Sequence, residues 1–516
     1  MRYKLLLAGL LLITLLGFSS LGLVRESAPS KTDRPNILFI ISDDHTWQAV
    51  SGYGSQLAQT PNIDRIAQEG AIFQNCLITN SICGPSRATL LTGQYSHVNG
   101  YRFNERVFDN RHWVFPEALK QNGYQTAWVG KLHLGSIPRG FDYVNVLPGH
   151  GDYYNSLFVT KTDTTRSRGY VTNVISEYAL DWLKGRDKDK PFMLVVGHKA
   201  THRIWLPDTS DLGAYDNVTF PLPPTFHDDY AGRPAAQQQD MSLERTMRLK
   251  EDLKVHMNYS QAPFRQMSPG QKQALYAYYE GKVSREFDSL KLTGRKLTEW
   301  KFQRYMRDYL ATAKSLDRNI GRLLTYLDHT GLSKNTVVVY TSDQGFYLGE
   351  HGWFDKRFIY EESLRTPFVM RYPGVIRSGT VLTQPVTNVD WAPTLLAIGQ
   401  TKVPSSIQGT SFLPLLRNPK APGRQGIYYH YYEYPEPHHV SPHFGLRTNR
   451  YTLARFYRGV ETWELYDRKT DPRQLRNIYN DPAYAEIVAQ LKRQLLTEID
   501  RYQDEEARQI MARKLN

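Results

Sequence analysis

The stretch Ile82-Cys83-Gly84-Pro85-Ser86-Arg87-Ala88-Thr89-Leu90-Leu91-Thr92-Gly93 is the part of the sequence around which the rest is organised. From Ala88 onward its pattern becomes helical, and Gly93 ends it. We therefore predict that Cys83 lies at or just before a helix N-terminus, where free N–H groups and the helix dipole favour an anion. A thiol in that place is expected to shift towards thiolate. For a lone cysteine, the alternative is a buried residue at an ordinary loop-to-helix junction.

Four apolar runs in the chain resemble buried strands, and each ends in polar side chains. The runs and the side chains that follow them are 36–41 with Asp43 and Asp44, 124–129 with Lys131 and His133, 191–196 with His198 and His202, and 337–340 with Asp343 and Gln344. A continuous apolar run indicates a strand buried on both faces of a parallel sheet. If the four strands are parallel neighbours, all four ends meet in one crevice. An Asp pair taken alone is more often a turn or a helix cap.

The residue types at these ends predict a metal and oxyanion site. Three aspartates and one glutamine amide form an oxygen-rich set that suits Ca²⁺ or Mg²⁺. Arg87, Lys131 and Lys356 add positive charge, which suits a multiply charged oxyanion. His133 and His202 are able to carry protons near neutral pH.

Composition sets the class of protein. The chain has 516 residues, 41% of them hydrophobic and 22% charged, as in a globular protein of two domains. Its net charge is +13, which favours an anionic partner. No dense Lys/Arg run occurs, so nucleic acid is not expected as a partner. The two cysteines, Cys76 and Cys83, make no disulfide framework and no zinc pattern. A bond between them is conceivable, but we expect Cys76 to be an ordinary buried thiol.

The N-terminus predicts export. Arg2 and Lys4 precede an apolar run from residue 5 to 18 and a small-residue region at 19–22, as in a cleaved signal peptide over residues 1–24. An uncleaved anchor is the alternative, because apolar character continues to Val24. No later segment reaches spanning length, so we expect a periplasmic or secreted protein without stable membrane insertion after cleavage.

The order of elements predicts an α/β domain over residues 35–420 and a smaller α+β domain over 424–516. Within the first, residues 71–78 are expected to form one strand, residues 206–300 an insertion of loops and helices, and residues 300–327 a long helix. From 424 onward, tyrosine-rich segments at 427–434, 444–456 and 462–467 indicate a small antiparallel sheet. A single amphipathic helix is expected from residue 484 to 515.

The chain resembles the type I sulfatases. The motif from Cys83 to Arg87, followed by Thr92 and Gly93, is similar to their signature C-x-P-S-R-x4-T-G, and the stretch 130–135 resembles their second signature. The similarity continues through residues 35–44, the His202 stretch and 342–356. It implies an alkaline-phosphatase-like mixed sheet flanked by helices, with a smaller C-terminal domain.

The resemblance also implies a mechanism. Cys83 would be oxidised by a formylglycine-generating enzyme, and the hydrated aldehyde would attack the sulfur of a sulfate ester. Its second hydroxyl would then lose a proton, so that the aldehyde reforms and sulfate leaves. The implied ligands of one Ca²⁺ ion are Asp43, Asp44, Asp343, Gln344 and the modified residue 83. The implied catalytic groups are Arg87 and Lys131 around the hydrate, His133 as proton acceptor, and His202 and Lys356 at the sulfate and the leaving alcohol.

Within that family, residues 149–155, 198–203, 228–233 and 353–357 resemble bacterial enzymes that act on N-acetylglucosamine 6-sulfate in host glycans. Asp355, His443 and Arg447 are candidates for binding the sulfated saccharide, with surface or interdomain salt bridges as the alternative. His198 is a further candidate at the substrate site, either as a neighbour of the site or, in the alternative, as a packed histidine. A phosphonate or phosphodiester hydrolase shares the nucleophile motif and is the competing activity. A non-catalytic glycan binder would have lost Cys83 or the acids, which are all present.

Overall fold

The computed structural model describes residues 34–104 and 106–513. Its strands are β1 Asn36–Ser42, β2 Ala71–Phe73, β3 Cys76–Leu77, β4 Gln125–Lys131, β5 Tyr143–Leu147, β6 Leu157–Val159, β7 Thr164–Arg166, β8 Phe192–Gly197, β9 Thr336–Ser342, β10 Arg365–Thr366, β11 Phe368–Arg371, β12 Thr380–Leu382, β13 Val386–Thr387, β14 Gly426–Tyr431, β15 His443–Thr448, β16 Tyr451–Arg458 and β17 Val460–Asp467.

Its α-helices are α1 Pro61–Gln68, α2 Cys83–Thr92, α3 Ser96–Asn99, α4 Phe115–Gln121, α5 Val171–Gly185, α6 Pro234–Gln238, α7 Pro269–Tyr278, α8 Arg285–Leu290, α9 Gly294–His329, α10 Glu361–Leu364, α11 Trp391–Ile398, α12 Leu413–Arg417, α13 Ala485–Tyr502 and α14 Glu505–Ala512.

Ten strands form the main sheet, in the order β12-β2-β11-β9-β1-β8-β4-β5-β6-β7. Its centre, β9-β1-β8-β4-β5, is parallel, whereas β11 joins β9 antiparallel and β6 joins β5 antiparallel. The sheet is therefore mixed, as the sequence predicted. The four expected strands are indeed parallel neighbours, which brings their carboxyl ends to one edge.

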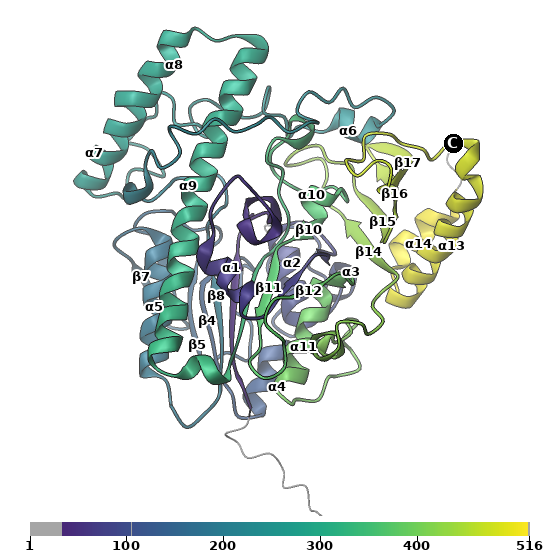
Figure 1. Cartoon of the computed structure of the whole chain (residues 1–516), viewed down its shortest axis with the longest axis horizontal. Coiled ribbons are helices and arrows are strands. Elements are labelled where there is room, and N and C mark those ends of the chain that lie inside the picture. The colour runs from purple at the N-terminus through teal and green to yellow at the C-terminus, as the bar shows by residue number, and fades with distance from the viewer. Residues whose placement is uncertain (1–33, 105, 514–516) are drawn as a thin grey trace, which may run out of the picture.

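Helices cover both faces of this sheet (Figure 1). Along β1, Phe39 and Ile41 join a core that includes α2, α4 and α11, while Leu38 and Ile40 join a second core that includes α1, α5 and α9. Successive side chains of a strand point to opposite faces, so a strand buried on both sides must be apolar throughout. That requirement explains the uninterrupted apolar runs in the sequence.

Two predicted elements are wrong in detail. Residues 71–78 form two short strands in different sheets: β2 joins the main sheet, whereas β3 pairs with β10 and β13. The terminal helix is also two helices, α13 and α14. It breaks at Gln503, whose φ of 59° is left-handed, and Asp504 then caps α14 by accepting the N–H of Ala507. The segment 206–300 holds turns, α6, α7, a π-helical turn at 279–284, α8 and the start of α9.

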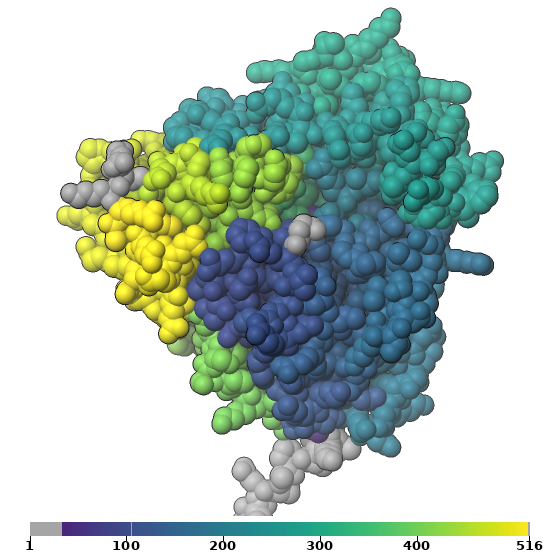
Figure 2. All heavy atoms as spheres, turned by 180° about the vertical axis from the view of Figure 1, so that it is seen from behind, coloured from purple at the N-terminus to yellow at the C-terminus, as the bar shows by residue number. Residues whose placement is uncertain are grey.

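A separate four-stranded antiparallel sheet, β14-β15-β16-β17, carries α13 and α14 near the C-terminus. Tyr95 and Val389 from the first part of the chain belong to its apolar core. Figure 2 shows this yellow segment against the blue segment near residue 100, where Arg102 pairs with Glu506 at 2.9 Å. The division into domains at 420–424 stays a prediction.

The predicted signal peptide lies outside the described residues. Among the helices that the structure describes, none combines the length and the apolar character needed to cross a membrane.

Gly130 tests the packing of the central strands. Its φ is +94°, and a Cβ at this position would lie 2.1 Å from the carbonyl oxygen of Gly197 on β8. Gly130→Ala should lower the free energy of unfolding by about 3 kcal/mol, because strain and overpacking add. Chemical denaturation measures the change. Gly185→Ala is the matched control: it ends α5, has no atom within 4 Å of the added Cβ, and should alter stability by less than about 1 kcal/mol. Equal effects of the two substitutions would contradict the packing described here.

Candidate active site

Polar residues from all four strand ends meet at one edge of the sheet, with the exception of His198. Asp43 and Asp44 follow β1, Asp343 and Gln344 follow β9, and Lys131 is the last residue of β4. The oxygens of the three aspartates lie within 4.8 Å of one another, and all three side chains are buried. Asp44 has a left-handed φ of 62°, and its N–H donates to Asp343 Oδ1 at 3.2 Å. This strained turn brings the carboxylates together.

The donor set fits a hard divalent cation. Asp43 Oδ1 and Gln344 Oε1 are buried and accept no hydrogen bond from any residue that the structure describes. Unpartnered buried oxygens are rare in proteins unless water or an ion completes them. Carboxylate and amide oxygens are ligands that Ca²⁺ and Mg²⁺ prefer. Asp43, Asp44, Asp343 and Gln344 can therefore hold such an ion.

The carboxylates strongly influence one another's titration. Burial raises the pKa of Asp44 to about 7, against the effect of Lys356, and the neighbouring Asp43 and Asp343 raise it further. Burial and Asp43 raise the pKa of Asp343 to about 6. Burial also acts to raise the pKa of Asp43, but Lys131 and the other cations hold it well below its usual value. A divalent cation would favour the ionised form of all three acids.

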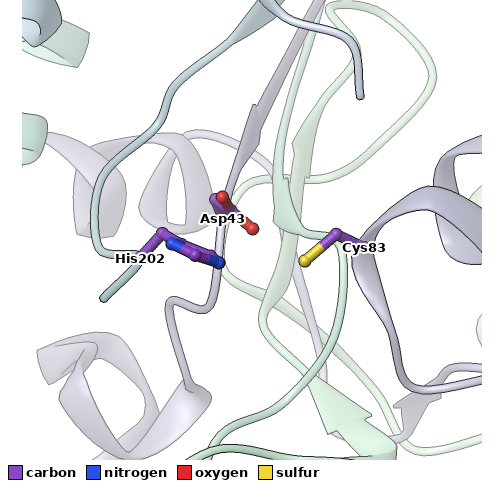
Figure 3. A group of neighbouring side chains, drawn as sticks. All are labelled: Asp43, Cys83 and His202. Carbon is purple, nitrogen blue, oxygen red and sulfur yellow. The ribbon is translucent and has the colours of Figure 1, made fainter. Parts of the chain in front are cut away.

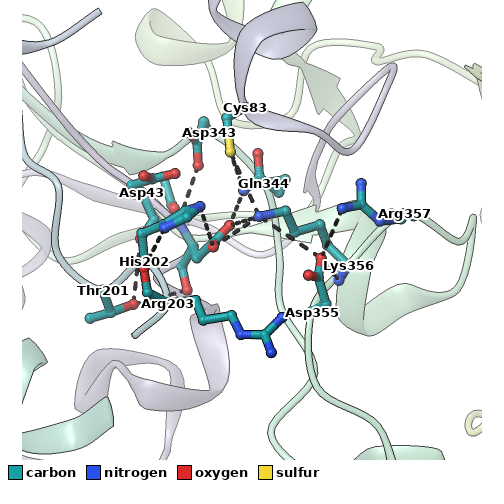
Figure 4. A network of polar contacts seen from close by, with 12 residues as sticks. Asp43, Cys83, Thr201, His202, Arg203, Asp343, Gln344, Asp355, Lys356 and Arg357 are labelled. Atoms are coloured by element: carbon teal, nitrogen blue, oxygen red, sulfur yellow. Dashed lines mark hydrogen bonds and ion pairs between the residues drawn. The ribbon is translucent and has the colours of Figure 1, made fainter. Parts of the chain in front are cut away.

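Each carboxylate has a cationic partner from a different segment, and Figure 4 shows one of these cations, Lys356, close to Cys83 and Gln344. Lys131 pairs with Asp43, Arg87 Nη2 lies 2.9 Å from Asp343 Oδ2, and Lys356 Nζ lies 2.6 Å from Asp44 Oδ1. The Lys356 ammonium is also 3.6 Å from Cys83 Sγ. Fixed cations therefore surround the position of residue 83, as an oxyanion site requires.

Cys83 is the first residue of α2, as predicted. In Figure 3 its sulfur points towards Asp43 and His202. The residues after it fasten the helix to the strand ends: Ser86 Oγ donates to the Asp343 carbonyl at 2.5 Å, and Arg87 Nη1 donates to the Lys131 carbonyl at 2.8 Å. The signature spacing thus serves to position the site as well as to supply its groups.

The expected shift of Cys83 towards thiolate is wrong. Burial, and then the charge of Asp43, raise the pKa of this thiol well above its usual value. The helix N-terminus does not compensate for a desolvated site with nearby carboxylates. Cys83 and Cys76 are both free and buried, so no disulfide joins them.

Three imidazoles lie together at one side of the site, where the ring of His150 is stacked on that of His202 and tilted against that of His133. The ring centroids of His133 and His150 are 4.0 Å apart, and those of His150 and His202 are 4.3 Å apart. His202 Nε2 lies 3.9 Å from Asp44 Oδ2. Burial lowers the pKa of both His133 and His202 below the ordinary value. Sequence reasoning did not name His150 as a site residue; the signals were its position between two glycines after a strand and its place in the stretch 149–155, which carries part of the family resemblance.

A pocket of about 530 Å³ opens over these groups. Asp44, Cys83, His150, His202 and Lys356 lie at it, and further residues that line it are Phe103, Asn104, Arg203, Phe346, Asp355, Arg357 and the segment 433–438. A pocket of this size suits a small ligand.

The C-terminal segment builds one wall of the pocket. His438 Nε2 lies 3.0 Å from Asp355 Oδ2, and Glu433 Oε2 lies 3.1 Å from Arg357 Nη1. Asp355 and Arg357 have left-handed φ values of 80° and 99°. These strained residues on either side of Lys356 form a second polar cluster at the pocket wall.

Three predicted substrate-binding residues do not line this pocket. His443 is buried in β15: its Nε2 accepts the Ile359 N–H at 3.1 Å, and its Nδ1 lies 2.8 Å from the Ser441 carbonyl. Both ring nitrogens are thereby occupied.

Arg447 pairs with Glu361 at 2.9 Å, so the salt-bridge alternative holds. His198 is fully buried and packed, with no hydrogen-bond partner on either ring nitrogen. The C-terminal contribution comes from residues 433–438 instead.

Comparison with known families agrees with this geometry. The family model "Sulfatase" matches residues 35–400, and the model "N-sulphoglucosamine sulphohydrolase, C-terminal" matches residues 349–501. The first covers more than half of the chain. It includes every strand whose end contributes to the site.

Individual relatives extend the comparison. An N-acetylglucosamine-6-O-sulfatase of Bacteroides thetaiotaomicron is 45% identical over 514 residues, covering 95% of this chain and 91% of the relative. The solved structure of BT4656 in complex with its substrate D-glucosamine-2-N,6-O-disulfate has a TM-score of 0.90 at 44% identity, covering 93% of this chain and all of that one. The phosphonate monoester hydrolase of Agrobacterium radiobacter shares the fold alone, with a TM-score of 0.67 at 18% identity over 91% of this chain and 96% of that one. A family model across the catalytic core and a relative at 45% identity together show that this chain belongs to the sulfatase family and is a sulfatase.

Proposed function

We propose that this sulfatase removes the 6-O-sulfate from a glucosamine unit of a sulfated glycan, with a formylglycine at position 83 and one Ca²⁺ ion. The observation that carries the reaction is the set of three buried carboxylates, each with its own cation, around Cys83. The relatives named for glucosamine 6-sulfate support the choice of sugar. The pocket of about 530 Å³ is of a size to hold a terminal sugar.

The proposed ion is held by Asp43, Asp44, Asp343 and Gln344, with residue 83 completing the set. When bound, it withdraws charge from the sulfate oxygens and favours ionisation of the attacking hydroxyl. The formylglycine hydrate supplies that hydroxyl, together with a second one through which sulfate is later released. A thiol has no second hydroxyl. Its raised pKa also makes unmodified Cys83 a poor nucleophile.

The remaining roles belong to fixed side chains. Lys131 and Arg87 are held by Asp43 and Asp343, and they orient the hydrate and stabilise charge on the sulfate in transfer. His133, whose buried Nδ1 has no partner, accepts the proton of the second hydroxyl. Lys356 and His202 flank the pocket beside Asp44 and protonate the leaving alcohol.

Recognition of the sugar is proposed for the second polar cluster. Asp355 is held between Arg357, at 3.7 Å, and His438, at 3.0 Å. Burial acts to raise the pKa of its carboxyl, but Arg357, Lys356 and His438 hold that pKa well below its usual value. A fixed carboxylate accepts hydrogen bonds from sugar hydroxyls, and the neighbouring cations donate to them. We further propose that a formylglycine-generating enzyme modifies Cys83, and that the protein is exported to the periplasm or the medium.

A substrate panel tests the function. The enzyme, produced in a host with the modifying enzyme, should release sulfate from glucosamine 6-sulfate at least about 100-fold faster, in kcat/KM, than from the 3-sulfated isomer or from a 2-sulfated uronic acid. The physical reason is the proposed binding mode, in which the 6-sulfate faces residue 83 and the ring hydroxyls face Asp355 in the same pocket. Equal rates on all three sugars would contradict the proposed sugar, and faster cleavage of an aryl phosphodiester than of an aryl sulfate would contradict the sulfatase assignment.

Mass spectrometry of the peptide that contains residue 83 tests the nucleophile. Protein from the native host should carry an aldehyde at this position, because an unmodified thiol cannot complete the reaction. Cys83→Ala should lower kcat by more than about 10³-fold, since it removes the attacking group. Cys76→Ala is the control, because Cys76 is buried away from the pocket, and it should keep kcat. Full activity with an unmodified thiol would refute the mechanism.

The raised pKa values of Asp44 and Asp343 predict how cation binding depends on pH. The pKa values of Asp44 and Asp343 in the cation-free fold, about 7 and about 6, exceed those of an unfolded chain. These two acids therefore bind protons more tightly in the fold than in the unfolded chain, and their own contribution to cation-free stability rises as pH falls through 7. Because Ca²⁺ competes with these protons, the rise in Tm that it causes should be largest above pH 7 and should shrink towards pH 5.

Thermal unfolding with and without Ca²⁺ measures this effect. At 100 times Kd, the ion should add about 2.7 kcal/mol to the free energy of unfolding. Asp343→Asn should abolish most of the Tm shift, whereas Asp229→Asn, in an exposed loop, should leave it unchanged. A shift that is independent of pH, or that survives Asp343→Asn, would count against the site.

A further inference from the structure

His150 lies at the centre of the active site, although it is outside both sulfatase signatures. Its ring lies between those of His133 and His202, tilted against the first and stacked on the second, with centroid distances of 4.0 and 4.3 Å. It also lines the pocket together with Cys83 and Lys356. His150 thus contacts His133 and His202, the two histidines that transfer protons in the proposed mechanism.

A tight turn presents the ring. His150 follows β5, between Gly149 and Gly151, whose φ values are 55° and 64°. The Gly151 N–H donates to the Pro148 carbonyl at 3.1 Å and closes the turn. A Cβ on Gly151 would lie 2.9 Å from Leu147 Cδ1. This left-handed turn favours glycine on both sides of the histidine, which fixes where the ring points.

The hydrogen bond from Lys131 fixes the state of the ring. Lys131 Nζ lies 3.1 Å from His150 Nδ1. An ammonium has donors only, so Nδ1 must be the acceptor and carries no proton. The ring is then neutral, with its N–H at Nε2. Burial, followed by the charge of Lys131, lowers the pKa of His150, which agrees with this tautomer.

Two acceptors therefore share the ammonium of Lys131. Asp43 takes one N–H and His150 Nδ1 takes another. The third N–H is left for residue 83 or the sulfate. Without His150, the ammonium would be free to rotate about its contact with Asp43. A displacement of about 1 Å at a reacting centre costs on the order of 100-fold in rate.

We propose that His150 is a positioning residue for the reaction: its Nδ1 acceptor holds the Lys131 ammonium so that the remaining N–H faces the group transferred at residue 83. The inference rests on the role proposed above for Lys131. It requires an acceptor at the place of Nδ1 and does not require the imidazole to change its charge.

Three substitutions at one position test the inference, with an aryl sulfate as the substrate so that recognition of the sugar plays no part. Asparagine carries its amide oxygen close to the place of Nδ1, whereas the amide of glutamine reaches towards the place of Nε2. His150→Ala and His150→Gln should lower kcat by about 10- to 100-fold with little change in KM. His150→Asn should recover kcat to within about threefold of the wild type.

His329→Asn, on α9 outside the pocket, is the matched control and should change neither kcat nor KM.

The outcomes separate the possible roles. Rescue by glutamine but not by asparagine would overturn the inference and place the function at Nε2, in contact with substrate. Wild-type kcat in His150→Ala would overturn it outright, as would failure of a folded His150→Asn to recover activity. Thermal unfolding checks folding, and the comparison of asparagine with glutamine holds even if the alanine variant is unstable.

The variant Lys131→Ala distinguishes a failure of this inference from a failure of the proposed function. If Lys131→Ala keeps its activity, the role proposed for Lys131 fails, and the positioning role fails with it. If Lys131→Ala is inactive while His150→Ala is fully active, only the positioning role fails.

Discussion

The mutual repulsion of three buried carboxylates is the constraint on which the structure of this sulfatase depends. One carboxylate oxygen from each of Asp43, Asp44 and Asp343 lies within 4.8 Å of the others, and all three side chains are buried. Such a cluster is tolerable only with compensating positive charge. The chain supplies part of it through Lys131, Arg87 and Lys356, each from a different segment. The parallel sheet is what allows segments so distant in sequence to meet at one edge.

The same electrostatics explain why the site suits sulfate esters. The cations that neutralise the carboxylates also face residue 83, so an incoming oxyanion meets positive charge that is already fixed in place. Holding these groups in advance avoids reorganisation during the reaction. The strained φ values at Asp44, Asp355 and Arg357 show that the backbone is held in unusual conformations around this arrangement.

The sequence alone predicted the sheet and the centre of the site, because both depend on local patterns. Strands buried on two faces must be apolar throughout, and the polar residues after β1, β4, β8 and β9 then fall at one edge. The features that it missed depend on tertiary contacts. His150 is placed by a turn with two left-handed glycines, and His438 reaches Asp355 only through the fold of the C-terminal segment. By residue type, His443 and Arg447 are as suitable for binding a sulfated sugar as the residues that line the pocket. Only packing showed that their polar atoms are already engaged.

The burial of residues at the N-terminus of α2 limits when the proposed modification of Cys83 can take place. Cys83, Pro85 and Arg87 have essentially no surface in the folded chain. A modifying enzyme that has to bind the residues on both sides of Cys83, as proposed above, would therefore need the chain before it folds. On that proposal, a molecule that folds with the thiol unmodified would keep a thiol in place of the attacking hydroxyl.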